Sequence, residues 1–223
     1  MCGRFNLSYT TSDLSAQLPY VLWDFEQIPS FNIAPSHQIS VISEMAGEVR
    51  GSRMQWGIPI TTSGNRSVLM SNTRTEGILE RDVWNKGTGR ICFIPASGFY
   101  EWDKVSKERI PYNIQLQESG LFLMLGIFRE TSSFLSCSVL TCPAGARLGN
   151  IHHRSPVILP TDIDLKIKKS HMGEMEFLKK ALDYQSKINL RLTKVSPKIN
   201  SVKNNTPDCL LEDNTQQMKF LYL

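Results

Sequence analysis

Cys2 is the residue whose position gives it the most distinctive chemistry. The chain begins Met1-Cys2-Gly3-Arg4, and the small side chain of Cys2 permits removal of Met1. The exposed residue would then carry an amine and a thiol on adjacent carbons. The amine can form an imine with an aldehyde, and the sulfur can close on the same carbon to give a thiazolidine. Both groups are partly nucleophilic at neutral pH, because an α-amine titrates near ~8 and a thiol near ~8.5. The alternative is that Cys2 is an ordinary second residue.

A carboxylate lies between two aromatic residues in the segment Gly98-Phe99-Tyr100-Glu101-Trp102. Desolvation by such neighbours raises the pKa of a carboxyl group and suits it to general acid catalysis. The alternative is a solvated glutamate at the end of a strand.

Two adjacent histidines stand in Ile151-His152-His153-Arg154. Histidine transfers protons near neutral pH, and an arginine can hold a phosphate. Adjacent residues of an extended segment point to opposite faces, so we expect only one of the two histidines to face a site. A structural histidine is the alternative.

Further polar and aromatic residues could bind a sugar–phosphate chain. Asn72 and Arg74 share a face if their segment is extended. Arg4 lies two residues from Cys2, where a guanidinium would attract a phosphate and lower the pKa of the thiol. Trp56 and Trp102 are candidate stacking platforms for unpaired bases, with a place in the core as the alternative.

The composition indicates a globular chain without a cofactor motif. The 223 residues carry a net charge of +4 and are 41% hydrophobic, which suffices for a core and for an anionic partner. The five cysteines form no CxxC pair, so we expect buried free thiols and neither a metal site nor a cofactor. Without a signal peptide or an apolar span, the expectation is a cytoplasmic, nucleoid-associated monomer with no membrane partner.

Patterns typical of strands dominate the sequence, and helical patterns are few and peripheral. We therefore expect one α+β domain over residues 1–223, built on a strongly curved mixed sheet or open barrel. A helix is predicted from Thr11 with Ser12 or Asp13 as its N-cap. Residues 67–70 are predicted as a buried strand, and residues 110–116 and 121–128 as a hairpin. The other predicted strands span 38–43, 48–57, 90–95 and 135–141, and the other predicted helices span 75–84 and 174–184, the last with Met175, Leu178 and Leu182 on its apolar face.

The combination of motifs resembles the SRAP (SOS response-associated peptidase) family of abasic-site processing proteins. The resemblance spans nearly the whole chain, and its specificity comes from the order and spacing of several short motifs. These are Met1-Cys2-Gly3-Arg4-Phe5, Phe31-Asn32-Ile33-Ala34-Pro35, Trp56-Gly57, Asn72-Thr73-Arg74-Thr75-Glu76, Pro95-Ala96-Ser97-Gly98-Phe99-Tyr100-Glu101-Trp102, Ile151-His152-His153-Arg154-Ser155-Pro156, Val195-Ser196 and residues 200–207.

The resemblance implies a protein that recognises abasic sites in single-stranded DNA and crosslinks to them through its amino-terminal cysteine. It implies Cys2 as nucleophile, Asn72 as a support for the deoxyribose and the amino terminus, Glu101 as an aid to ring opening and imine formation, and His152 as a proton carrier for the sugar oxygen. The DNA contacts would be Arg4, Asn32, Pro35, Trp56, Arg74, Trp102 and Arg154, and replication-fork junctions are further expected partners. Ser155 and Phe128 depart from the family pattern, which has methionine and tryptophan there, and both are interpreted as packing positions.

Other functions use the same features. An amino-terminal-nucleophile amidohydrolase, such as a glutamine amidotransferase domain, also begins Cys-Gly and uses its free amine as a base. A peptidase that removes its own Met1 and a non-enzymatic DNA-binding module are further alternatives. A covalent shift of an abasic oligonucleotide, set against ammonia release from glutamine, separates these functions.

Overall fold

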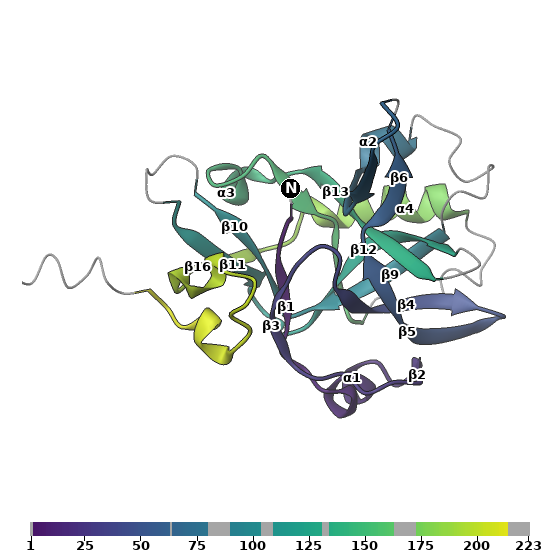
Figure 1. The fold of residues 1–223 in the computed structure, drawn as a ribbon, viewed down its shortest axis with the longest axis horizontal. Helices are drawn as coiled ribbons and strands as arrows, with labels where there is room; N and C mark the ends of the chain where they lie inside the picture. Colours follow the sequence, from purple (N-terminus) through teal and green to yellow (C-terminus); the bar gives the residue numbers. More distant parts are fainter. Residues whose placement is uncertain are drawn as a thin grey trace, which may run out of the picture.

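The structure is a computed structural model that describes residues 2–62, 64–79, 90–103, 109–130, 134–162 and 173–213. Strands dominate it, and short helices lie at the edges (Figure 1). The strands are β1 Phe5–Leu7, β2 Leu22–Trp23, β3 Ser30–Ile33, β4 Gln38–Met45, β5 Glu48–Trp56, β6 Ile58–Thr61, β7 Ser67–Met70, β8 Asn72–Arg74, β9 Arg90–Ala96, β10 Gly98–Trp102, β11 Pro111–Leu116, β12 Phe122–Glu130, β13 Leu135–Pro143, β14 Arg154–Pro156, β15 Ile158–Pro160 and β16 Leu190–Lys194.

The helices are α1 Thr11–Gln17, α2 Thr75–Leu79, α3 Ala146–Gly149 and α4 Glu174–Gln185, with 3-10 turns η2 Pro197–Asn200 and η3 Pro207–Leu210. None of the helices in these described stretches is long and apolar enough to cross a membrane. The expected α+β class with a curved mixed sheet is confirmed. The single-domain extent over 1–223 stays a prediction.

Residues of the candidate site come from two sheets. The five-stranded sheet has the order β16-β11-β10-β1-β3. The nine-stranded sheet follows β14-β13-β12-β9-β4-β5-β2, with β15 paired to β12 and β8 paired to β13. It curves so far that β13 also pairs with β5, in parallel, at Ser136↔Gln55 and Cys137↔Trp56. Asn72 of β8 donates to the carbonyl oxygen of Cys2, which links the larger sheet to the residues before β1 of the smaller sheet.

The middle of the large sheet is buried on both faces. Residues 122–128 of β12 are all buried, which explains why this strand reads as a continuous apolar run and does not alternate. Its neighbours β9 and β13 are nearly as apolar inside. On the outside, α4 packs Phe177 edge-on against Phe93 of β9, with ring centroids 5.7 Å apart.

Several element predictions need correction. The N-cap of α1 is Thr10, because its hydroxyl accepts from the backbone N–H of Asp13 while the Asp13 carboxylate accepts from the backbone N–H of Thr10. Helix α4 buries Phe177, Leu178 and Ala181, whereas Met175 is only half-buried. The predicted helix 75–84 begins as α2, and its residues 80–84 lie outside the described residues.

The predicted hairpin of residues 110–128 is wrong. Strand β11 pairs with β10 and β16, whereas β12 pairs with β9, β13 and β15 in the other sheet. The polar turn between them carries the chain from one sheet to the other. Strand β7, predicted as buried, pairs only with β6 among the described strands and leaves Val68 and Leu69 each 42% exposed.

Gly126 tests how tightly the buried strand β12 is packed. A Cβ at this position would lie 2.9 Å from the carbonyl oxygen of Ser138 and 3.0 Å from the sulfur of Cys92. Gly126→Ala should therefore lower the free energy of unfolding by about 1–3 kcal/mol, because a backbone atom must move. Urea denaturation measures the change. Gly149→Ala, where a Cβ meets nothing within 4 Å, is the control, and equal stability of the two variants would contradict the packing.

Candidate active site around Cys2

The thiol of Cys2 is fully buried at the start of the chain. Its sulfur donates to the carbonyl oxygen of Arg4 at 3.6 Å. Burial raises the pKa of the Cys2 thiol well above its usual range, and the nearby carboxylate of Glu101 raises it further. The Arg4 backbone does lower this pKa, as the carbonyl that accepts from the thiol, but burial and Glu101 outweigh it, so a net lowered pKa at Cys2 is not found. All five cysteines are free and buried, as predicted.

Asn72 ties the amino terminus to the large sheet. It begins β8, whose parallel pairing with β13 aligns Asn72 with Val139. Its Nδ2 donates to the carbonyl oxygen of Cys2 at 2.8 Å and to Oγ of Ser71 at 3.2 Å. Its Oδ1 is buried and accepts no hydrogen bond from the described residues. A buried amide oxygen without a donor is costly, so this atom is suited to receive an N–H or O–H brought by a reactant.

Glu101 and His152 form a buried pair, and the charge of Glu101 acts on the Cys2 thiol. Both are about 5% exposed, and Nδ1 of His152 lies 3.7 Å from Oε1 of Glu101. The same Nδ1 lies 3.1 Å from both the backbone nitrogen and the backbone oxygen of Arg154. When Nδ1 carries no proton it can accept from the backbone N–H of Arg154. When it is protonated it can donate to the Arg154 carbonyl oxygen or interact with Glu101. His153 is exposed, so one histidine of the pair faces inward, as expected.

Arg154 is already paired with a carboxylate. Its side chain is 8% exposed and binds Glu76 of α2 through both guanidinium ends, with Nη2–Oε2 at 3.0 Å. Nη2 also donates to the carbonyl oxygen of Thr141. The Arg154 pair lowers the pKa of Glu76 to about 2. The sequence analysis assigned no role to Glu76, although this residue ends the family motif Asn72-Thr73-Arg74-Thr75-Glu76 and lies in the first turn of α2.

A second polar cluster connects Arg4 to the C-terminal segment. Nη1 of Arg4 donates to Oδ1 of Asn32 at 2.6 Å and to the carbonyl oxygen of Ile199 at 2.8 Å. The guanidinium lies 6.0 Å from the ring centroid of Trp102, whose indole N–H donates to Oδ1 of Asn200 at 2.7 Å. The residues 197–210 therefore pack against β3 and β11, next to the amino terminus (Figure 1).

The predicted DNA contacts divide by exposure. Arg74 is exposed, and Arg4, Pro35 and Trp102 are half-exposed. Asn32 is 1% exposed, and its Nδ2 donates to three carbonyl oxygens of the C-terminal segment, so it is a structural residue. Trp56 is fully buried and its ring is not a stacking platform. Both corrections have one cause: the sequence does not show that another segment covers these side chains.

The family model for SOS response associated peptidase (SRAP) matches residues 1–202. The chain belongs to the SRAP family. The abasic site processing protein YoaM of Bacillus subtilis is 30% identical over 230 residues, covering 96% of this chain and 99% of YoaM. YoqW of the same organism is 29% identical over 221 residues, covering 94% of this chain and 99% of YoqW. Rat HMCES, also called an abasic site processing protein, is 30% identical over 268 residues, covering 94% of this chain and 75% of HMCES.

Solved structures share the fold of this SRAP chain. A protein from Bacteroides thetaiotaomicron superposes with a TM-score of 0.76 at 16% identity, covering 95% of this chain and all of that protein. A protein from Bordetella bronchiseptica gives a TM-score of 0.63 at 18% identity, covering 87% of this chain and all of that protein. At these identities the likeness shows the fold alone.

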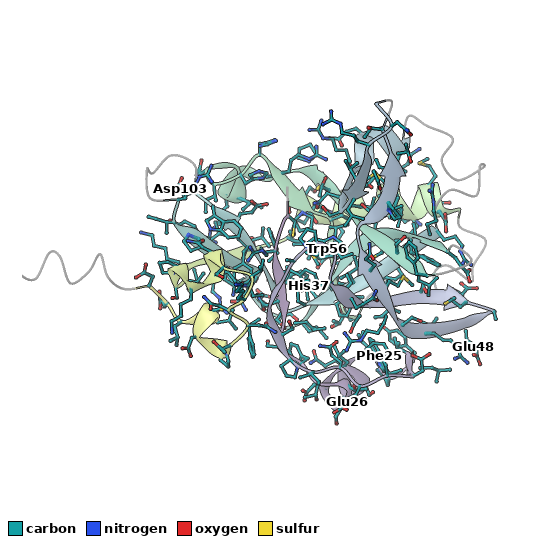
Figure 2. All side chains as sticks on the ribbon, in the orientation of Figure 1. Phe25, Glu26, His37, Glu48, Trp56 and Asp103 are labelled. Atoms are coloured by element: carbon teal, nitrogen blue, oxygen red, sulfur yellow. The ribbon has the colours of Figure 1, made fainter. Side chains whose placement is uncertain are left out.

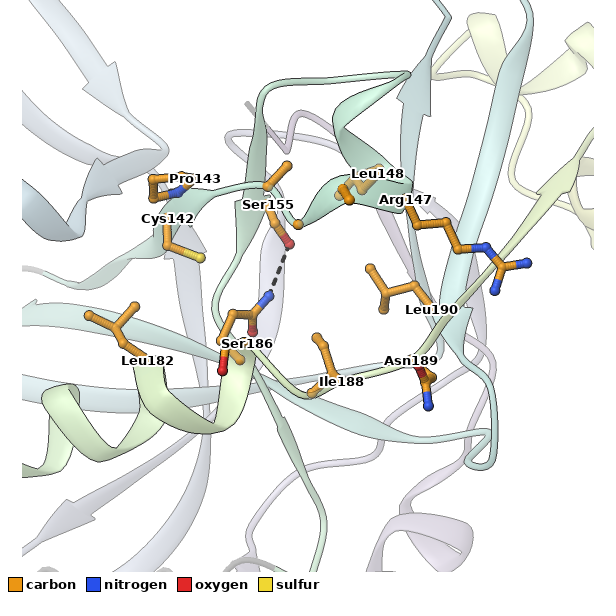
Figure 3. Close-up of a pocket in the computed structure, with 14 residues that line it drawn as sticks. Cys142, Pro143, Arg147, Leu148, Ser155, Leu182, Ser186, Ile188, Asn189 and Leu190 are labelled. Atoms are coloured by element: carbon orange, nitrogen blue, oxygen red, sulfur yellow. Dashed lines mark hydrogen bonds between the residues drawn. The ribbon is translucent and has the colours of Figure 1, made fainter.

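A separate cavity lies outside the Cys2 cluster of this SRAP chain. It has a volume of about 400 Å³ between α3, α4 and the start of β16 (Figure 3). Ser155 lines this cavity and accepts a hydrogen bond from Gln185. The cavity lining includes none of Cys2, Asn72, Glu101 and His152. Ser155 and Phe128, the two departures from the family pattern, are both 1% exposed, which confirms them as packing positions.

The Glu76–Arg154 pair predicts a specific acid sensitivity. Because folding lowers the pKa of Glu76 from its usual 4.5 to about 2, the pair stabilises the fold fully above pH ~5, and its contribution disappears as the pH falls toward 2. Glu76→Gln should therefore cost up to about 1 kcal/mol at pH 7, since the carboxylate is 45% exposed, and progressively less at lower pH.

Chemical denaturation of the wild type and of Glu76→Gln between pH 7 and pH 3 measures the difference in their free energies of unfolding. Glu48→Gln, which breaks an exposed pair with Arg50, is the control and should leave stability nearly unchanged. A Glu76→Gln deficit that does not shrink on acidification would contradict the assignment.

Proposed function

We propose that this chain binds abasic sites in single-stranded DNA and forms a thiazolidine crosslink with them through the amine and thiol of Cys2, after removal of Met1. The observation that carries the proposal is the restraint of Cys2 itself. Its carbonyl oxygen accepts a hydrogen bond from Asn72 at 2.8 Å, and the charge of buried Glu101, which lies 3.7 Å from His152, acts on its thiol. The names of the family's abasic site processing members support the same substrate.

The proposed chemistry conserves every atom. The ring-opened deoxyribose presents an aldehyde at C1′, and the Cys2 amine adds to it to give a carbinolamine. Loss of one water yields an imine, whose nitrogen keeps the bond to C1′. The thiol then adds across the imine, so that sulfur bonds to C1′ and the thiol proton moves to nitrogen. The product is a neutral ring plus one water.

Burial orders these steps. A thiol that stays buried after removal of Met1 would remain protonated, because burial raises its pKa, and would not attack other electrophiles first. The amine therefore begins the reaction. Glu101 would take the thiol proton when the ring closes, and its electrostatic effect on that thiol supports this role. His152, at 3.7 Å from Glu101, would exchange protons with the sugar oxygen and reset the carboxyl group.

The surface around the site suits an unpaired strand. Arg74 and Arg4 would contact phosphates, and Trp102 and Pro35 would contact the bases next to the gap. A net charge of +4 fits a few phosphate contacts, which is a footprint suited to local recognition. On this proposal the protein acts as a monomer on cytoplasmic DNA, at single-stranded stretches that include fork junctions.

Replacement of Cys2 tests the proposal directly. Cys2→Ser keeps the amine but removes the sulfur, so the stable adduct with an abasic oligonucleotide should disappear. A reversible imine should remain, which borohydride reduction traps. Denaturing gels measure both species, and Cys92→Ala, which alters a buried thiol on β9, should crosslink like the wild type. An undiminished, heat-stable adduct of Cys2→Ser would refute the ring, and ammonia release from glutamine would favour an amidohydrolase.

Replacement of Glu101 tests the proton transfer. Glu101→Gln should slow crosslinking by about a hundredfold, the scale of one general acid–base group, while the affinity for an abasic analogue that lacks the aldehyde stays within twofold. Single-turnover kinetics and fluorescence anisotropy measure the two quantities. Glu118→Gln, at an exposed carboxylate, is the control. A parallel loss of rate and affinity would make Glu101 a structural residue.

A further inference from the structure

Trp56 is the largest fully buried side chain among the described residues, and its indole N–H has a specific partner. It ends β5, and its Nε1 donates to the carbonyl oxygen of Ser71 at 2.8 Å. A buried indole N–H usually has an acceptor, and the surrounding fold determines which group that acceptor is. Here the acceptor is the peptide that directly precedes Asn72.

The Ser71 carbonyl is held from two sides. It accepts from the indole of Trp56 and also from the backbone N–H of Val139 at 3.0 Å. The next residue, Asn72, donates its side-chain amide both to Cys2 and to Oγ of Ser71. The orientation of the Ser71 peptide therefore sets the position of the amide that restrains Cys2.

Trp56 also touches the other segments around the site. Its ring meets the ring of Phe5 edge-on, with centroids 5.1 Å apart, and Phe5 lies three residues after Cys2. Its backbone accepts from Ser36 at 2.7 Å and donates to the carbonyl oxygen of His37 at 2.9 Å, which fixes the turn after Pro35. Figure 2 shows Trp56 and His37 together in the middle of the molecule. Ser36 adopts φ 76°, a conformation that a non-glycine residue keeps only when its surroundings enforce it.

We propose that Trp56 is a positioning residue for the Cys2 reaction, and that its indole N–H acts through Ser71 and Asn72 to fix the Cys2 carbonyl. The inference rests on the proposed function and extends it to a residue that touches neither the reacting atoms nor DNA. Packing alone would make any large aromatic residue sufficient at this position. The hydrogen bond makes the N–H itself necessary for the rate.

Trp56→Phe is the decisive variant, because it keeps an aromatic ring against Phe5 and removes only the N–H and part of the ring. With saturating abasic oligonucleotide, its single-turnover crosslinking rate should fall about tenfold, the effect of one lost hydrogen bond of about 1.4 kcal/mol. Its affinity for the aldehyde-free analogue should stay within twofold. Trp23→Phe is the matched control, because the buried Nε1 of Trp23 has no hydrogen-bond partner among the described residues, and it should react like the wild type.

A double-mutant cycle separates positioning from general packing. If Trp56 acts through Asn72, Trp56→Phe should change the residual rate of Asn72→Ala less than twofold, whereas independent effects would multiply. If Trp56→Phe fails to fold, benzothienylalanine at position 56 keeps the shape of the indole without its N–H. An unchanged crosslinking rate in folded Trp56→Phe overturns the inference, and so do effects of Trp56→Phe and Asn72→Ala that multiply. In either case, crosslinking by the wild type still upholds the proposed function. Absence of a wild-type adduct overturns both.

Discussion

The hydrogen bond from the Asn72 side chain to the Cys2 carbonyl is the contact on which the site depends. The first residues of a chain usually fray, because few contacts offset their conformational entropy. Here Cys2 is fully buried, and Phe5 lies in β1, which pairs with β10 and β3. The amino terminus is thereby held like a core element. On the proposed function this restraint has a use, since the amine and thiol of Cys2 would have to reach one carbon in sequence.

The two-sheet architecture explains how distant segments meet at Cys2. Strand β10 of the smaller sheet supplies Glu101, and β8, which pairs with β13 of the larger sheet, supplies Asn72. The turn after α3 supplies His152. These residues lie 70 to 150 positions from Cys2 in the sequence, so contacts between separate sheets and turns bring them together. Glu101 is buried 3.7 Å from His152, where water is scarce, and its charge helps to raise the pKa of the Cys2 thiol.

Local patterns predicted much of this molecule and failed where distant segments decide the outcome. Loose alternation predicted the strand 48–57, the strand 135–141 was also predicted, and Asn72, Glu101 and His152 were singled out as polar residues beside strand ends. The apparent hairpin at 110–128 failed because β11 and β12 find better partners in separate sheets. The predictions that Trp56 offers a stacking platform and that Asn32 contacts DNA failed because their side chains bind carbonyl groups far along the chain, Ser71 for Trp56 and residues 199–204 for Asn32. The raised pKa of the Cys2 thiol follows from burial, which the adjacent Arg4 could not reveal.

Intact-mass spectrometry of the purified protein, before and after incubation with an abasic oligonucleotide, tests the central claim most directly. The account predicts a protein that lacks Met1 and an adduct whose mass is the sum of the two partners less one water. That mass should not change on borohydride treatment, because a thiazolidine has no imine left to reduce. Capture of DNA by protein that retains Met1, or by protein whose terminal amine has been blocked, would contradict the account.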